Sequence, residues 1–273
     1  MYFITISEMI GTNGEKIARK VAEELKYTFF GEEALFEAAS EVGFLSDIKK
    51  LDEKAPALLE RFFSEKPKIY LDRLQSVIYE VAKNGNAIFF GRGGQFLLQS
   101  FDCAFHILVT GSMEKRIQRV MKEKHVGKEV AEKIISRSDH DKRAFIRFAY
   151  DEDWLNCRLY DLLLNTDKLS IDSAVKMIVD AAKSDGIKSC GTESVQLLGK
   201  LSLNRKVESI LLEAGVMSPH LFSTVEGPDS VRLYGIVNSP EEKEGIEKLV
   251  KKIKGVKNIK NELVVFTRSM SGA

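Results

Sequence analysis

The stretch GTNGEKIARKVAEEL, residues 11–25, decides the fold of the first part of the chain. Its apolar residues recur at spacings of three and four, which predicts a helix with one buried face: Ile17, Ala18, Val21, Ala22 and Leu25. A short β-branched strand is predicted before it, from Tyr2 to Ser7, and a polar loop from Glu8 to Gly14 joins the two. A strand, a glycine-bearing loop and a helix in this order are typical of the opening of a phosphate-binding α/β unit.

Outward from this unit, short apolar strands alternate with helical stretches. The further predicted strands are residues 27–30, 87–90, 105–109 and 160–164. The predicted helical stretches are residues 32–83, 112–150 and 171–182. This alternation predicts an α/β fold of three layers, in which a parallel sheet carries helices on both faces.

The pattern changes after residues 184–199, which are rich in Ser, Gly, Thr and Lys and are predicted to be a linker. A small second domain is expected at residues 200–266, with the order α-β-β-α-β. The two predicted domains are therefore residues 1–183 and 200–266, and the tail at 267–273 is expected to be disordered.

Length and composition indicate a globular protein of two domains without a strong overall charge. The chain has 273 residues and a formal net charge of +1, so neither nucleic acid nor an anionic membrane is expected as a partner. The three cysteines, Cys103, Cys157 and Cys190, lie far apart, which argues against a disulfide framework and a Cys-rich metal site. The four histidines lack ligand spacing, so no metal site is predicted. No apolar run is long enough to span a membrane and no signal pattern opens the chain, so the expected compartment is the cytoplasm.

Five stretches carry a resemblance to a known family: ITIS at 4–7, residues 11–25, NGNAIFFGRGG at 84–94, SDHDKRAFIRFAYDEDW at 138–154 and YDLLLNTDKL at 160–169. Together they make residues 1–183 resemble the cytidylate kinase-like family, a branch of the nucleoside monophosphate kinases. The resemblance implies a P-loop NTPase-like fold. It also implies ATP with Mg²⁺ as the phosphoryl donor, and CMP or a related monophosphate as the acceptor.

The second domain resembles a BON domain. The residues that carry this resemblance are VRLYGIVNSPEEKEGIEKLV at 231–250 and GVKNIKNELVV at 255–265. BON domains are associated with the binding of ligands, phospholipids or partner proteins rather than with catalysis, so the resemblance implies a protein or lipid ligand for this domain.

By the first resemblance, the loop before the helix at residues 15–25 would hold the phosphates of ATP. The residues concerned are Gly11, Thr12, Asn13, Gly14 and Lys16. Glycines permit close backbone approach, and a helix N-terminus favours negative charge. The signature G-x-x-x-x-G-K-[ST] is absent, because Gly14 stands where its lysine would be.

The chain departs from the family at three charged positions. Members commonly carry arginines where this chain has Glu8 and Glu15, and a third arginine, on the acceptor side, is replaced by Glu32. Lys16 is the only cation expected within reach of the loop, and a carboxylate beside a triphosphate lowers its affinity. Two interpretations stay open: a retained nucleotide site, or a plain connection between a strand and a helix.

The acceptor monophosphate is expected near Arg92. This residue follows an apolar strand directly and is flanked by Gly91 and Gly93, so an oxyanion can approach and the guanidinium can grip it with two hydrogen bonds. The resemblance adds Arg73 and Gln75, on the preceding helix, to the lining of this pocket. The alternative interpretation is a surface turn and a solvated helix face.

A basic helical stretch is the candidate lid and the candidate catalytic element. Asp139, Arg143 and Arg147 recur every four residues and share a face, and Arg137 precedes them. In monophosphate kinases, arginines of a mobile lid neutralise the charge on the transferring phosphoryl group. The alternative is an exposed helix stabilised by ion pairs.

Two functions follow from these patterns. The first is a nucleoside monophosphate kinase-like enzyme, in which positioning and electrostatics transfer the γ-phosphate of ATP to CMP or a related monophosphate. The second is a catalytically impaired nucleotide-binding protein that signals through the BON-like domain, as the three acidic departures favour. The sequence leaves the oligomeric state undetermined.

Overall fold

The computed structural model describes residues 3–42, 66–187, 190–216 and 220–266. It divides into two compact units, and each is described by itself. The first contains Met1–Leu35 and Asn84–Gly191, and the second contains Phe36–Lys83 and Thr192–Ala273. The second unit therefore includes a segment from within the first predicted domain.

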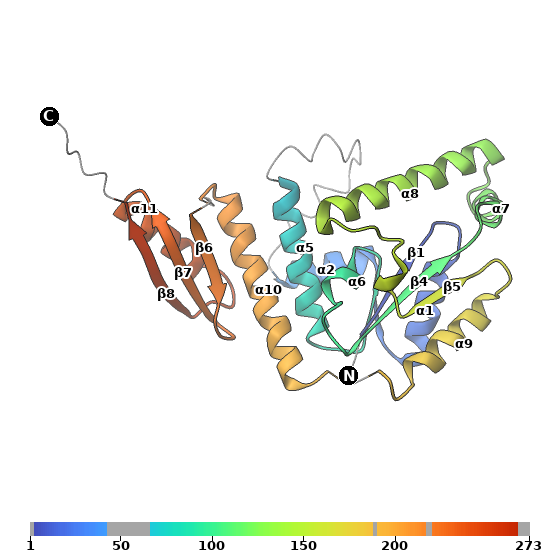
Figure 1. The fold of residues 1–273 in the computed structure, drawn as a ribbon, viewed down its shortest axis with the longest axis horizontal. Coiled ribbons are helices and arrows are strands. Elements are labelled where there is room, and N and C mark those ends of the chain that lie inside the picture. The colour runs from blue at the N-terminus through green and yellow to red at the C-terminus, as the bar shows by residue number, and fades with distance from the viewer. Residues whose placement is uncertain (1–2, 43–65, 188–189, 217–219, 267–273) are drawn as a thin grey trace. The chain divides into compact units, whose positions relative to one another are not determined.

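The first unit is built on a five-stranded parallel sheet (Figure 1). Its strands are β1 (Phe3–Glu8), β2 (Thr28–Phe30), β3 (Ala87–Phe90), β4 (Ala104–Thr110) and β5 (Leu162–Asn165). The strand order is β2-β3-β1-β4-β5, and Phe3 of β1 pairs with Ala87 on one side and Ala104 on the other. The central position of β1 brings its carboxyl end next to the ends of β3 and β4, where ligands sit in open α/β sheets.

One face of this sheet is covered by α1 (Gly14–Leu25) and α9 (Ile171–Ala182). Ile4 and Ile6 of β1 are fully buried against Ile17 and Val21 of α1, and the buried face of α9 completes the same cluster. The three-to-four spacing of residues 17–25 predicted this face correctly, because burial of an apolar stripe is what holds a surface helix to a sheet.

The opposite face is covered by the short helix α6 (Gly94–Leu97) and the end of α8 (Lys128–Tyr150). Leu108 of β4 packs there against Ile146 and the fully buried Trp154. A helix layer on each face confirms the predicted three-layer α/β fold.

Two further helical segments of the first unit connect the elements named above. They are α7 (Met113–Lys124) and the 3₁₀ turn Cys157–Leu159, while α2 (Glu32–Val42) begins in the first unit and continues into the second. Helix α7 packs on α8 through Ile117, Val120, Ala131 and Ile135.

The second unit contains two helices that pack through polar side chains, α5 (Lys66–Ala82) and α10 (Thr192–Glu213). At the middle of the contact the hydroxyl of Ser76 donates to the Ser202 carbonyl at 2.9 Å. On one side of it Arg205 donates to Asp72 at 3.3 Å, and Arg73 pairs with Glu213 at 2.5 Å.

The rest of the second unit is a three-stranded sheet with order β6-β7-β8 (Figure 1). Its elements are β6 (Leu221–Val225), β7 (Ser230–Val237), α11 (Pro240–Lys251) and β8 (Asn258–Val265). Val207 and Leu211 of α10 and Ile246 and Val250 of α11 are buried on this sheet. The predicted order α-β-β-α-β is therefore confirmed.

The predicted linker needs correction. Helix α10 begins at Thr192, so residues 192–199 are helical rather than an unstructured connection. Apolar periodicity is weak there, because Leu198 is the only buried residue of this described segment and most of the others are exposed. The expected disordered tail at 267–273 lies outside the described residues, as does part of the helical stretch predicted at 32–83.

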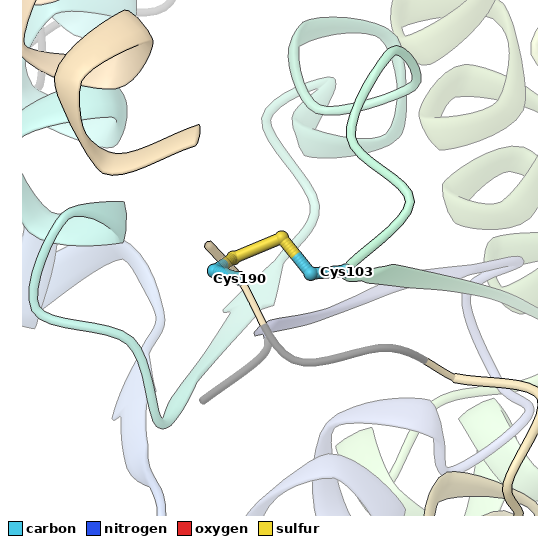
Figure 2. The surroundings of a disulfide bond; sticks show 2 residues. All are labelled: Cys103 and Cys190. Atoms are coloured by element: carbon cyan, nitrogen blue, oxygen red, sulfur yellow. A yellow bond between two sulfur atoms is a disulfide. The ribbon is translucent and has the colours of Figure 1, made fainter. Parts of the chain in front are cut away.

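A disulfide joins Cys103, just before β4, to Cys190, 87 residues further along the chain (Figure 2). The two Cα atoms lie 5.1 Å apart, within the usual range for such a bond. The expectation of no disulfide was therefore wrong, since the pairing depends on a long-range approach that cysteine spacing does not reveal. Cys157 is exposed and free.

Reduction of this disulfide is expected to destabilise the protein. A cross-link that closes a long loop typically contributes about 2–4 kcal/mol by restricting the unfolded chain. Dithiothreitol should therefore lower the unfolding temperature of the wild type, but not that of Cys190→Ser. The exposed Cys157→Ser is the control and should retain the response. Three reactive thiols in the denatured, unreduced protein would contradict the disulfide.

The α5–α10 contact is expected to weaken as pH rises. Burial, together with the nearby Glu208 carboxylate, raises the pKa of Asp72 to about 6, above its ordinary value of 3.8. The folded protein thus holds the proton more tightly than the unfolded chain, and stability falls between about pH 4 and pH 6.

Asp72→Asn should remove this penalty, which amounts to at most about 3 kcal/mol above pH 6. Calorimetric unfolding at pH 5 and pH 8 should show a gain for the variant only at the higher pH. Asp180→Asn, on an exposed position of α9, is the control. An equal loss at both pH values would instead show that the ion pair with Arg205 dominates.

Candidate phosphate-binding site

The loop between β1 and α1 has the backbone form of an anion-binding turn. Gly11 and Asn13 both adopt left-handed conformations, with φ of 84° and 62°. A Cβ atom on Gly11 would lie 2.9 Å from the backbone oxygen of Arg116, so only glycine fits. Asparagine is among the few other residues that tolerate the left-handed region, and here it directly precedes the first residue of α1 as its N-cap.

The carboxylate of Glu8 occupies the N-terminus of α1. Its Oε2 accepts a hydrogen bond from the Gly14 N–H at 2.7 Å and another from the Thr12 hydroxyl at 3.2 Å. A Cβ atom at Gly14 would lie 2.6 Å from the Glu8 side chain, so the glycine makes room for it. The position where a helix N-terminus would receive a phosphate is thus filled by an anion of the chain itself.

Three cations hold the loop by its carbonyl groups. Lys142 of α8 donates to the carbonyl of Glu8, and Arg116 of α7 donates to that of Ile10 at 2.8 Å. Arg119 donates to the Gly11 carbonyl at 3.3 Å. The prediction that Lys16 is the only cation within reach was therefore wrong.

These charges act on one another. Burial raises the pKa of Glu8, while Lys142 and the hydrogen bond from Gly14 act in the opposite direction. Burial likewise lowers the pKa of Lys142, against the attraction of Glu8 and Asp139. Asp139 in turn pairs with the buried Arg116 at 2.7 Å. A second anion entering this cluster would compete directly with Glu8.

The two remaining charged residues of the loop region point elsewhere. Lys16 lies 3.6 Å from Glu123 of α7, and both side chains are more than half exposed. Glu15 pairs with Arg19, one turn further along α1, at 2.7 Å. Glu15 therefore adds negative charge to the first turn of α1, but it is the Glu8 carboxylate that accepts the hydrogen bond from the Gly14 N–H.

The predicted acceptor residue Arg92 lies on a turn with three consecutive left-handed residues. Gly91, Arg92 and Gly93 have φ of 71°, 57° and 76°. The Gly91 N–H donates to the Ile6 carbonyl at 2.9 Å, so the turn begins beside β1. The guanidinium of Arg92 pairs with Glu32 at 2.8 Å. Glu32 therefore neutralises the arginine that was expected to bind the acceptor.

The end of α8 closes against this turn. A Cβ atom on Gly93 would lie 2.7 Å from the hydroxyl oxygen of Tyr150, and the Tyr150 ring stacks on Phe96 with centroids 4.7 Å apart. Gly93 is thus needed for the contact between the turn and α8.

The three predicted lid arginines lie on α8 and are exposed. Arg137 and Arg147 lie 3.7 Å and 3.4 Å from Asp141 and Asp151, each at helical spacing, and Arg143 is exposed between them. Asp139 pairs with Arg116 rather than with Arg143. The structure does not bring the three arginines to the loop, and their catalytic role stays a prediction.

Arg73 and Gln75, the other predicted acceptor residues, are buried on α5 in the second unit. Arg73 is held by Glu213 of α10. Their role in substrate binding stays a prediction, and the described contacts give Arg73 a structural partner instead.

The donor set fits a phosphate group once Glu8 has left. Two groups contact the Glu8 carboxylate, namely the Gly14 N–H and the Thr12 hydroxyl, and the Lys142 ammonium contacts the backbone carbonyl of the same residue. Each of the three is a kind of group that binds phosphate oxygens. A phosphate oxygen and Oε2 of Glu8 cannot both hold the Gly14 N–H. Among the described residues no group of three or more acidic, His or Cys side chains could hold a metal ion.

Sequence reasoning missed Lys142, Arg116 and Arg119 as neighbours of the loop. Each lies more than 100 residues from the loop carbonyl that it holds, so spacing gave no signal. The segment at 138–154 did mark α8 as part of the site, and Lys142 lies inside that segment.

Comparison with protein families agrees with this architecture. The sequence model of the cytidylate kinase-like family matches residues 3–168, and that of the BON domain matches residues 201–266. No helix within the described ranges combines the length and the apolar character needed to cross a bilayer.

Individual relatives cover the first part of the chain. The cytidylate kinase of Methanocaldococcus jannaschii is 27% identical over 183 residues, which is 65% of this chain and 96% of that protein. The cytidylate kinase of Pyrococcus horikoshii is 29% identical over 66% of this chain and 86% of its own length. A solved structure of an uncharacterised protein from Eubacterium ventriosum shares the fold, with a TM-score of 0.54 and 20% identity over 67% of this chain and 99% of that one.

Gly11→Ala is expected to destabilise the loop. The new Cβ atom would meet the Arg116 backbone, and a left-handed backbone costs an alanine about 1–2 kcal/mol before that clash is counted. Thermal unfolding should show the loss. Gly186→Ala is the matched control, since its nearest neighbour lies 3.9 Å away. Equal stability of both variants would contradict the described loop.

Proposed function

The chain belongs to the cytidylate kinase-like family, and from that membership we propose that it is a nucleoside monophosphate kinase-like phosphotransferase. In this proposal ATP binds at the β1–α1 loop, and CMP or a related monophosphate binds near Arg92. The transfer is restrained, because the Glu8 carboxylate must leave the N-terminus of α1 before a phosphate can enter.

The observation that supports this proposal is the anion-binding geometry of the loop. The Gly14 N–H already binds a carboxylate oxygen at 2.7 Å, and the Thr12 hydroxyl, which also donates to the Met9 carbonyl at 2.7 Å, lies 3.2 Å from the same oxygen. The loop thus offers donors at the place where a helix N-terminus receives a phosphate. Gly11 and Asn13 give the loop its backbone form. These residues would hold the phosphate chain of ATP.

Mg²⁺ would enter with the nucleotide, held mainly by phosphate oxygens and water, as is usual for this ion. It would supply neutralisation of the phosphate charge. The chain's own contribution is to orient the two nucleotides and exclude water, with Arg92 on the acceptor phosphate and the α8 arginines on the transferred group.

A second candidate is a nucleotide-binding protein without turnover that signals through the BON domain. The ion pair of Arg92 with Glu32 favours it, because an acceptor phosphate would have to displace a second carboxylate. Each displacement weakens binding or slows transfer without destroying the fold. The two candidates differ in turnover and agree on nucleotide binding.

The proposed substrates are metabolites of the cytoplasm, which is the compartment we propose. The Cys103–Cys190 bond would there be exposed to reduction by cellular thiols. A protein or lipid ligand of the BON domain completes the proposed partners.

Removal of the Glu8 carboxylate is the test of the proposal. Glu8→Ala should raise the affinity for ATP, measured by calorimetry with Mg²⁺, about tenfold or more, since a buried competing anion is lost. Coupled ADP release with a panel of monophosphates should rise in the same variant. Glu15→Ala, which removes an exposed carboxylate one residue beyond Gly14, is the matched control and should change little.

Three results decide between the candidates. Turnover in the wild type or in Glu8→Ala supports the phosphotransferase. Nucleotide binding without turnover in either protein supports the signalling candidate. An absence of nucleotide binding in both would refute the proposed function altogether.

A further inference from the structure

Lys142 extends from α8 to the start of the phosphate-binding loop. Its ammonium group donates a hydrogen bond to the backbone carbonyl of Glu8. The same nitrogen lies 4.8 Å from the centroid of the Trp154 ring, and a cation above an aromatic face is held there electrostatically. Because Trp154 is fully buried, this contact fixes the direction in which Lys142 points.

The other cations near the loop are committed elsewhere. Arg116 is divided between the Ile10 carbonyl and the carboxylate of Asp139. Arg119 binds the Gly11 carbonyl and Thr166. Both therefore act as supports of the loop backbone, and either would have to break these bonds to reach a ligand.

Lys142 differs from these arginines because its ammonium group has N–H donors left for a ligand. An ammonium group has three N–H donors, and the hydrogen bond to the Glu8 carbonyl uses one of them. The carboxylate of Glu8, on the same residue, lies in the field of this ammonium group and at the Gly14 N–H. An anion that replaced the carboxylate would lie beside the same cation.

We propose that Lys142 is the phosphate-binding cation of this site, in place of the lysine that the loop sequence lacks at Gly14. When the Glu8 carboxylate leaves, the Lys142 ammonium contacts the phosphate oxygens of ATP that take its position. This inference rests on the proposed function, and it assigns the missing charge to α8 rather than to the loop. The arrangement makes nucleotide affinity depend on two residues 134 positions apart, one competing with phosphate and one binding it.

The test measures binding to the full-length protein, not activity. Calorimetry with ATP and with tripolyphosphate, which has the phosphates but no base, is applied to the wild type, Lys142→Met, Glu8→Ala and the double variant. Loss of a charged hydrogen bond should weaken binding of both ligands about tenfold or more. Lys142→Arg should recover much of the loss. Lys133→Met, at an exposed position on the same helix, is the control.

The Glu8→Ala background separates a direct contact from an indirect one. If Lys142 binds phosphate, Lys142→Met weakens binding there as well. If Lys142 acts only on the Glu8 carboxylate, the change has no effect once the carboxylate is gone, and the inference is overturned. Glu8→Ala keeps the backbone carbonyl that Lys142 binds, so a role limited to holding the loop backbone would appear as a lower unfolding temperature of Lys142→Met in this background. Each variant is also compared by thermal unfolding. If Lys142→Met is partly unfolded at the temperature of the calorimetry, and this accounts for its weaker binding, the inference is overturned as well.

Failure of the proposed function gives a different result. In that case neither the wild type nor Glu8→Ala binds ATP or tripolyphosphate. Binding by Glu8→Ala that is unchanged by Lys142→Met refutes the role of Lys142 and leaves the nucleotide site standing.

Discussion

The hydrogen bond from the Gly14 N–H to the carboxylate of Glu8 is the interaction on which the site depends. It satisfies a backbone donor at the start of α1 that would otherwise need water or a ligand. It also places negative charge at the positive end of the helix, where a phosphate is favoured for the same reason. The fold thus keeps the positive helix end of a nucleotide site, but one of its own carboxylates occupies that end.

On the acceptor side, another carboxylate of the chain occupies a group that could bind phosphate. Arg92 stands at the end of β3, on a turn that glycines hold open, and Glu32 neutralises it. The family resemblance led us to expect arginine at both positions. Replacing a cation by an anion at such positions leaves the sheet and helices intact, because these side chains do not contribute to the apolar core. Architecture and chemistry can therefore diverge within one family.

The sequence predicted those parts of the molecule that depend on local patterns. The run at 87–90 and the periodicity of residues 17–25 identified β3 and α1, because burial of apolar side chains leaves a regular trace. The start of α10 was missed, because residues 192–199 are exposed or partly exposed except for Leu198, which leaves no apolar repeat in the sequence. The Cys103–Cys190 bond and the approach of Lys142 to Glu8 were missed for another reason, since tertiary folding alone brings such distant residues together.

Helix α5 lies inside the sequence of the kinase-like family, yet its packing partner α10 opens the BON region. The two modules are therefore interleaved rather than joined end to end. A recombination event that exchanged the BON module as a cassette would separate Ser76 from Ser202 and Asp72 from Arg205, and it would leave buried charge unpaired. A replacement module would therefore have to bring a helix whose polar side chains match those of α5.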